Sequence, residues 1–121
     1  MFQVTANQEK RLLIMTFVDH VAPEEMKSGA AKVKALLTEL PPGFRLLSDL
    51  SGLESMDPGC LPYISRSMDL MTKRGVAKVL RVIPDPHKDI GLNIMSLFHY
   101  QRRVPIVTCP TMEEAMAELA D

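Results

Sequence analysis

The sequence predicts one α/β domain over residues 1–121, built on a mixed, mostly parallel five-stranded sheet with an antiparallel hairpin at its N-terminal edge and four helices. Strand-like and helix-like segments alternate in the order ββαβαβαβα, and such alternation implies parallel pairing through right-handed crossovers. Segment LLIMTFV, residues 12–18, reads as a continuous apolar run, as is typical of a strand that helices cover on both faces. A chain of this length forms a single core without a metal ion or a disulfide.

The expected elements follow from apolar periodicity and from the positions of proline and glycine. The opening hairpin is expected at 1–5 and 11–18, the other strands at 44–48, 76–83 and 104–108, and the helices at 23–40, 58–73, 88–102 and 112–119.

Three of the four helices have recognisable starting residues. Pro23 and Pro58 fit the first turn of a helix, where an amide hydrogen is not needed. Asp57 supplies an N-cap before the second helix. Thr111 and Glu114 form a capping box before the last helix.

Charge and composition argue against two classes of function. The 14 basic and 15 acidic residues are nearly balanced, so the chain lacks the basic surface of a nucleic-acid-binding protein. No apolar run approaches the roughly 20 residues that span a bilayer, and the N-terminal residues do not resemble a signal peptide. We therefore expect a cytoplasmic protein without an integral membrane segment. Cys60 and Cys109 are isolated, which predicts neither a metal site nor a cofactor.

The stretch 44–57, FRLLSDLSGLESMD, is the first candidate site. Its apolar start predicts a buried strand, and its polar end predicts a loop over 49–57. Sites in open α/β sheets gather beyond the carboxyl ends of strands. The expected binding residues here are Asp49, Ser51, Gly52 and Asp57. A purely structural role is the alternative for two of them, since an aspartate caps helices and a glycine permits tight turns.

The segment LLSDLSGLESMDPGCLPYI resembles the central part of STAS domains, the fold of bacterial anti-sigma factor antagonists. The closer similarity is to the SpoIIAA-like subgroup, bacterial proteins that also resemble the Sec14 or CRAL-TRIO lipid-binding fold. PPGFRLLSDLSG, GVAKVLRVIPDP and DIGLNIMSLFHY carry this similarity. The resemblance implies a STAS-like fold and a role in binding a partner or a ligand.

One residue departs from the signalling members of that family. There the residue after the Met-Asp pair is a serine that a partner kinase phosphorylates, whereas here it is Pro58, which has no hydroxyl. Ser51, Ser55 and Ser65 lie nearby, but none occupies the matching position. The resemblance therefore does not extend to the phosphorylation switch.

The segment CLPYISRS, from Cys60 to Ser67, matches the C-x5-R-[ST] pattern of cysteine phosphatases. In such a site a thiolate attacks phosphorus, and Arg66 would bind the phosphate oxygens. Pro62 removes one amide from the expected phosphate loop, and no glycine lies between Cys60 and Arg66. The alternative is that Cys60 is a small residue in the first turn of a helix.

The three histidines provide a second catalytic hypothesis. A hydrolytic triad would require the fold to bring members of one set together: His20, His87, His99, Asp49, Asp85 and Ser51. Exposed loop histidines are the alternative. No two histidines have the i, i+4 spacing that places two metal ligands on one helical face.

The expected helix 88–102 has apolar residues on more than one face. This pattern fits the lining of a lipid-type cavity, a lid, a homodimer face, or ordinary burial on two sides. The residues concerned are Met95, Phe98 and Tyr100, with His99 and Arg102 as candidates for holding an anionic head group. Positive charge is also favourable at any helix C-terminus.

Three functions remain from the sequence. The first is a non-enzymatic regulatory or protein-interaction module that uses loop 49–57 and helix 58–73 to bind a protein partner. The second is a carrier or sensor of a small apolar or acyl ligand, with segment 88–103 as its gate. The third is a small cysteine phosphatase or hydrolase.

Overall fold

The computed structural model describes residues 1–84 and 104–120, and within them five strands form one sheet in the order β1-β2-β3-β4-β5. The strands are β1 (Phe2–Asn7), β2 (Leu12–Val21), β3 (Arg45–Met56), β4 (Lys78–Val82) and β5 (Ile106–Cys109). β1 and β2 pair antiparallel, and every other neighbouring pair is parallel. The mostly parallel sheet with an N-terminal hairpin is therefore confirmed.

Three α-helices lie in the described residues: α1 (Pro23–Leu37), α2 (Leu61–Lys73) and α4 (Met112–Leu119). The fourth expected helix, 88–102, falls outside the described residues, so three helices rather than four are seen. A short 3-10 turn, η1 (Pro58–Cys60), precedes α2 and takes up the first residues expected for that helix.

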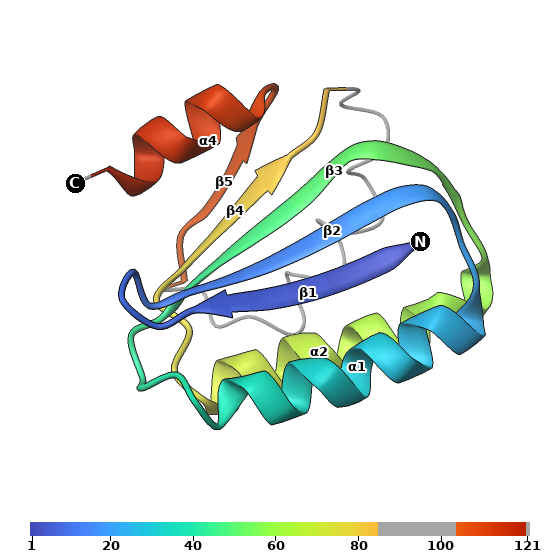
Figure 1. Cartoon of the computed structure of the whole chain (residues 1–121), viewed down its shortest axis with the longest axis horizontal. Coiled ribbons are helices and arrows are strands. Elements are labelled where there is room, and N and C mark those ends of the chain that lie inside the picture. Colours follow the sequence, from blue (N-terminus) through green and yellow to red (C-terminus); the bar gives the residue numbers. More distant parts are fainter. Residues whose placement is uncertain (85–103, 121) are drawn as a thin grey trace.

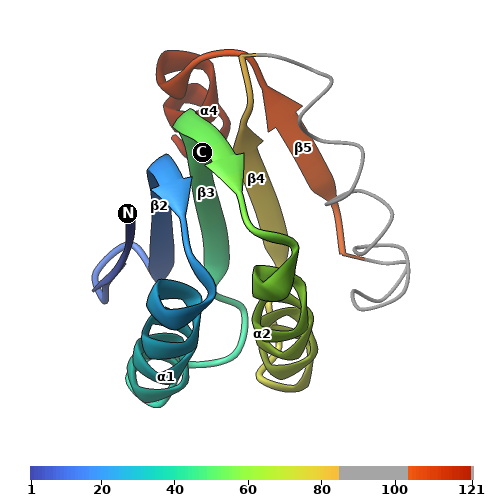
Figure 2. The ribbon, with the colours of Figure 1, turned by 90° about the vertical axis from the view of Figure 1, so that its right-hand side faces the viewer.

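The helices cover the two faces of the sheet unequally (Figures 1 and 2). α1 and α2 lie side by side on one face, and α4 lies on the other. The larger core forms under α1 and α2, where Leu13, Val33 and Phe44 are among the fully buried side chains. A smaller core forms under α4 around Leu47 and Leu80. Burial on both faces explains the continuous apolar run of β2.

The N-terminal hairpin is held to α1 through an aromatic side chain. The ring of Phe2 lies 4.9 Å from that of Phe17, centroid to centroid. The other neighbour of Phe2 is Gly29 of α1, where a Cβ atom would come within 2.2 Å of the ring. The glycine is therefore required for close approach of strand and helix rather than for an unusual backbone angle.

β3 differs most from the sequence-based expectation, because residues 49–56, expected as a loop, continue the strand to Met56. β2 is also longer than expected and extends to Val21, so it provides a parallel partner for the polar half of β3. The pairing register shifts twice along this half, and each shift accommodates an extra residue of β3. Such irregularities turn side chains outward, so this half of the strand is polar. Its polar sequence therefore predicted a loop.

Candidate interaction surface at the end of β3

The candidate surface is built by the ends of β2 and β3 together with η1. β4 pairs with β3 only as far as Asp49, opposite Val82. Beyond that point the described partner of β3 is β2. The polar end of β3 therefore projects past the described end of β4, in a part of the sheet where bulges redirect side chains (Figure 1).

Asp49 and Ser51 are held by each other. Asp49 Oδ1 accepts a hydrogen bond from the backbone amide of Ser51 at 3.0 Å and another from Ser51 Oγ at 2.6 Å. Ser51 and the next residue, Gly52, are exposed. This local bonding orders the bulge and leaves the outward surface of both residues available to a partner.

His20 and Ser55 form a second polar pair across the two strands. His20 Nδ1 lies 2.7 Å from Ser55 Oγ, and the two residues are directly paired in the register of β2 and β3. Both are exposed. The sequence analysis named each residue separately but did not predict the pair, because the two residues become neighbours only through the shifted register of β2 and β3.

The expected hydrolytic set is not assembled in the described residues. The hydrogen bonds join Asp49 to Ser51 and His20 to Ser55, as two separate pairs. The remaining members of the set, Asp85, His87 and His99, lie outside the described residues. The geometry that is described therefore provides no acid–base–nucleophile chain.

Asp57 acts as the cap that the sequence indicates, although it caps η1 rather than α2 itself. Its Oδ1 accepts a hydrogen bond from the backbone amide of Gly59 at 2.8 Å. Its own amide donates to the carbonyl of Val21 at 3.1 Å, which ties the end of β3 to the end of β2. Asp57 thus joins the strand end to the start of the helix.

The cysteine of the phosphatase-like motif is buried and unreactive in its setting. Cys60 Sγ donates a hydrogen bond to the carbonyl of Val21 at 3.4 Å. Burial, with the nearby charge of Asp57, raises the pKa of the Cys60 thiol above its ordinary value, so the thiol stays protonated at neutral pH. Arg66 is exposed and lies over the Tyr63 ring at 5.7 Å. The geometry does not support a phosphate-binding cysteine loop.

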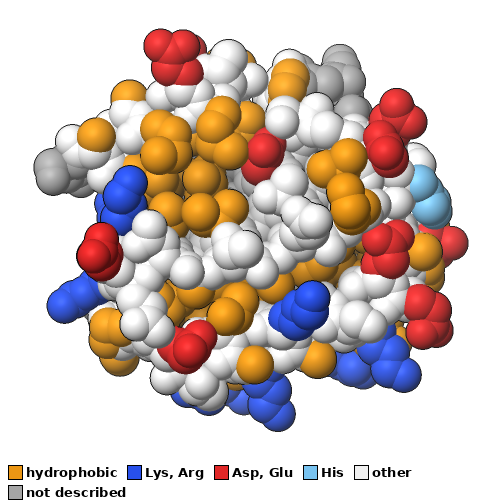
Figure 3. All heavy atoms as spheres, in the orientation of Figure 1, with side chains coloured by type: hydrophobic (Ala, Val, Ile, Leu, Met, Phe, Trp, Pro, Cys, Tyr) orange, Lys and Arg blue, Asp and Glu red, His pale blue; other side chains and the backbone are white. Residues whose placement is uncertain are grey.

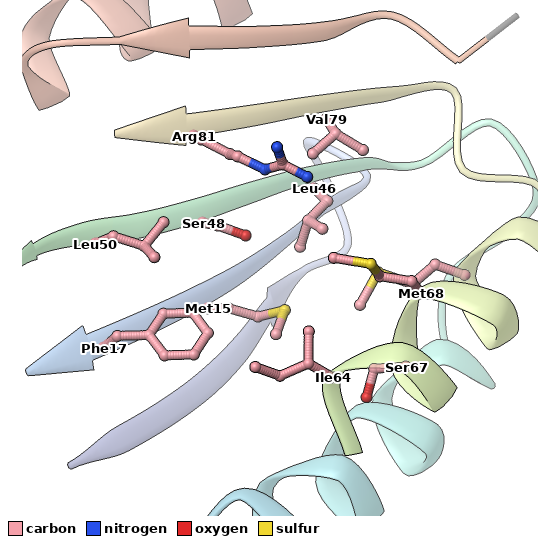
Figure 4. A pocket seen from close by; sticks show the side chains of 11 residues that line it. Met15, Phe17, Leu46, Ser48, Leu50, Ile64, Ser67, Met68, Val79 and Arg81 are labelled. Carbon is pink, nitrogen blue, oxygen red and sulfur yellow. The ribbon is translucent and has the colours of Figure 1, made fainter. Parts of the chain in front are cut away.

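A small, partly open cavity of about 30 Å³ lies between α2 and the strands β2, β3 and β4 (Figure 4). Most of its lining is apolar, but Ser48, Ser67 and Arg81 also border it, and all three are buried. This volume suits about one or two water molecules, whereas ligand pockets occupy roughly 300–1,000 Å³. As lined by the described residues, this cavity is too small for an acyl ligand. An arginine inside the apolar segment VLRVI was the available sequence signal for this polar lining.

The residues expected to form a second, lipid-type site are Met95, Phe98, His99, Tyr100 and Arg102. All of them lie outside the described residues, so their role stays a prediction. In residues 1–84 and 104–120, no group of three His, Cys, Asp or Glu side chains is arranged to hold a metal ion. No helix in the same described part is long and apolar enough to cross a bilayer.

Solved structures share this architecture over nearly the whole chain. An uncharacterised protein from Shewanella loihica PV-4 with a SpoIIAA-like fold aligns with a TM-score of 0.72 at 12% identity, covering 99% of this chain and 93% of that chain. The anti-sigma factor antagonist SpoIIAA in its unphosphorylated form aligns with a TM-score of 0.66 at 14% identity, covering 98% of this chain and 97% of that one. The chain has the SpoIIAA fold.

An anti-sigma factor antagonist from Mycobacterium paratuberculosis also aligns with this chain, with a TM-score of 0.63 at 15% identity, covering 100% of this chain and 96% of that chain. No protein-family model and no curated protein sequence matches the chain. The STAS-like resemblance noted in the sequence is thus confirmed as a shared fold. The further resemblance to the Sec14 or CRAL-TRIO fold gains no support from these structures.

Proposed function

We propose that this chain is a regulatory protein-interaction domain that binds a partner protein through the end of β3 and the start of α2. The observation that carries the proposal is the exposed polar surface of Ser51, Gly52, Ser55 and Asp57 on a SpoIIAA fold. Two of the structures with this fold are anti-sigma factor antagonists. An anti-sigma factor is accordingly the first class of partner to test.

Regulation of this binding would differ from a phosphorylation switch at the start of α2. Pro58 opens η1 and has no hydroxyl to modify. The surface is also ordered without a modification, because Asp49 holds Ser51 and Asp57 holds Gly59. We propose that partner binding does not depend on any modification of residue 58.

The experiment is a pull-down with the purified chain, followed by identification and re-expression of the recovered partner for a measurement of affinity. Ser51→Asp adds a charge to the proposed surface and places a second carboxylate against Asp49. It is expected to abolish recovery of the partner. Ser28→Asp, at an exposed serine of α1, is the matched control and is expected to leave recovery unchanged.

Circular dichroism of both variants checks that the fold is intact. Equal recovery by the Ser51→Asp variant and the wild-type chain would show that the end of β3 is not the binding surface.

A further inference from the structure

A wide open groove lies between α1 and α2, on the side facing away from the sheet. Its volume is about 530 Å³. Its lining includes the half-buried Ala30 and Leu70 and the buried Ser67. The two helices run side by side along its whole length (Figures 1 and 2). Such a trough has the shape that accepts a third helix, since helices approach to about 8–10 Å where side chains are small.

The rims of this groove carry basic residues at a regular spacing. Lys27 and Lys34 line the α1 side, and Arg66 and Lys73 line the α2 side. Each pair is seven residues apart, which is two helical turns or about 10 Å along the axis. Figure 3 shows basic side chains along the lower edge of the molecule, where α1 and α2 lie. A heptad spacing on both rims matches the flanking charges of a packed helix.

These four basic side chains are exposed, and none forms an ion pair with a carboxylate in the described part of the chain. Arg66 is instead placed over the Tyr63 ring. One acidic residue, Asp69, also lines the groove. The groove is therefore strongly positive on a chain whose overall charge is nearly zero. Its complement is an acidic surface.

Ser67 adds an independent observation at the base of the groove. Its residue is only 4% exposed, and its Oγ has no hydrogen-bond partner within the described residues. The hydroxyl points away from the side chains of the strands (Figure 4). An unsatisfied buried hydroxyl is unfavourable in a finished core. The hydroxyl is inaccessible to solvent, so it marks imperfect packing at the base of the groove and is not itself a contact for a docked helix.

From the groove, its rims and its charge, we infer that α1 and α2 form a docking site for an acidic amphipathic helix of a partner protein. Carboxylates of that helix, seven residues apart on each side of an apolar stripe, would pair with Lys27 and Lys34 on one rim and with Arg66 and Lys73 on the other. This site is separate from the end of β3. The inference rests on the proposed function and extends it: the groove would be a second contact with a partner protein, and an acidic helix would fill it.

The test uses two synthetic helical peptides with the same apolar stripe, one flanked by glutamates at heptad spacing and the other by lysines in their place. Binding to the full chain is followed by fluorescence anisotropy at low and at high salt. The glutamate peptide is expected to bind, and salt is expected to weaken it. Lys27→Glu with Lys34→Glu, and separately Arg66→Glu with Lys73→Glu, should each weaken binding about tenfold or more.

The matched control is Lys10→Glu with Lys32→Glu, which changes the net charge equally at exposed lysines outside the groove. Its affinity for the glutamate peptide should stay within about twofold of wild type. Equal weakening by the control pair and the rim pairs would overturn the inference, because it would reduce the effect to net charge. Equal binding of the two peptides would overturn it as well.

Two further measurements distinguish the helix site from a membrane contact and from the surface at the end of β3. Binding of the chain to phosphatidylserine vesicles through the rim lysines, without binding of the glutamate peptide, would overturn the helix site in favour of a membrane contact. The Ser51→Asp variant should keep full affinity for the glutamate peptide, because Ser51 is outside the groove. Failure of the peptide experiment alongside partner loss in the Ser51→Asp variant would reject the groove and leave the proposed function standing.

Discussion

At the scale of single residues, the polar side chains near the end of β3 bond to close neighbours, and the Cys60 thiol beside them is buried. Asp49 accepts a hydrogen bond from Ser51, His20 and Ser55 share another, and Cys60 donates one to a main-chain carbonyl. These contacts order the exposed polar side chains at the end of β3, and the Cys60 thiol stays inside the fold.

The two buried cysteines predict a loss of stability in alkaline solution. Burial raises the pKa of both Cys60 and Cys109 above the ordinary value of 9.0. Below that value the thiols are protonated in the folded and the unfolded chain, so their ionisation does not change the free energy of unfolding. As the pH rises past it, the unfolded chain loses its thiol protons first, and the free energy of unfolding decreases.

Urea unfolding at a series of pH values from 7 upward measures this effect, with the Cys60→Ala and Cys109→Ala double variant as the control. The wild-type chain should lose stability more steeply than the variant. Parallel curves for the two proteins would show that the thiols do not titrate differently on unfolding.

A second residue-level prediction concerns the contact of Phe2 with Gly29. Gly29→Ala places a Cβ within 2.2 Å of the Phe2 ring, so we expect a loss of about 1–3 kcal/mol in the free energy of unfolding. In a Phe2→Ala background the same change should be neutral, or stabilising by about 0.5–1 kcal/mol, because alanine favours a helix over glycine. Denaturant unfolding of the wild-type chain, the two single variants and the double variant completes the double-mutant cycle. An equal loss of unfolding free energy in both backgrounds would show that the new Cβ does not clash with the Phe2 ring.

At the scale of elements, β3 and η1 connect the fold to the candidate surface. The sequence predicted the hairpin, the alternation of strands and helices, and the cap at Asp57, because each has a local signal in apolar spacing or in a capping residue. The length of β3 was not predictable in that way. Its polar half becomes a strand only because β2 extends beside it with a shifted register, which is a property of two segments together.

The cap at the start of η1 can be tested as an element. Asp57→Ala removes the acceptor for the Gly59 amide and should cost about 1 kcal/mol of stability. Asp57→Asn keeps an oxygen acceptor at the same place and should recover most of that loss. Thermal or urea unfolding compares the three proteins. If the alanine and asparagine variants were equally stable, the hydrogen bond would not contribute as a cap.

At the scale of the whole molecule, a SpoIIAA fold presents two distinct outer surfaces, the polar end of β3 and the basic groove between α1 and α2. The first was predicted from the single stretch 44–57, although as a loop, whereas the groove could not be recognised from one segment of sequence. The basic residues of the groove are spread over two helices about 40 residues apart in the chain, and only their packing brings Lys34 and Lys73 to opposite rims of one trough. The buried polar lining around Ser67 and Arg81 likewise depends on tertiary contacts.

Hydrogen–deuterium exchange of the chain, alone and bound to its recovered partner, shows whether the end of β3 is the binding surface. Binding is expected to slow exchange of the backbone amides from 50 to 59, across the end of β3 and through η1, with or without added protection along the groove. Unchanged exchange in that segment, with protection confined to α4 or to the N-terminal hairpin, would contradict it.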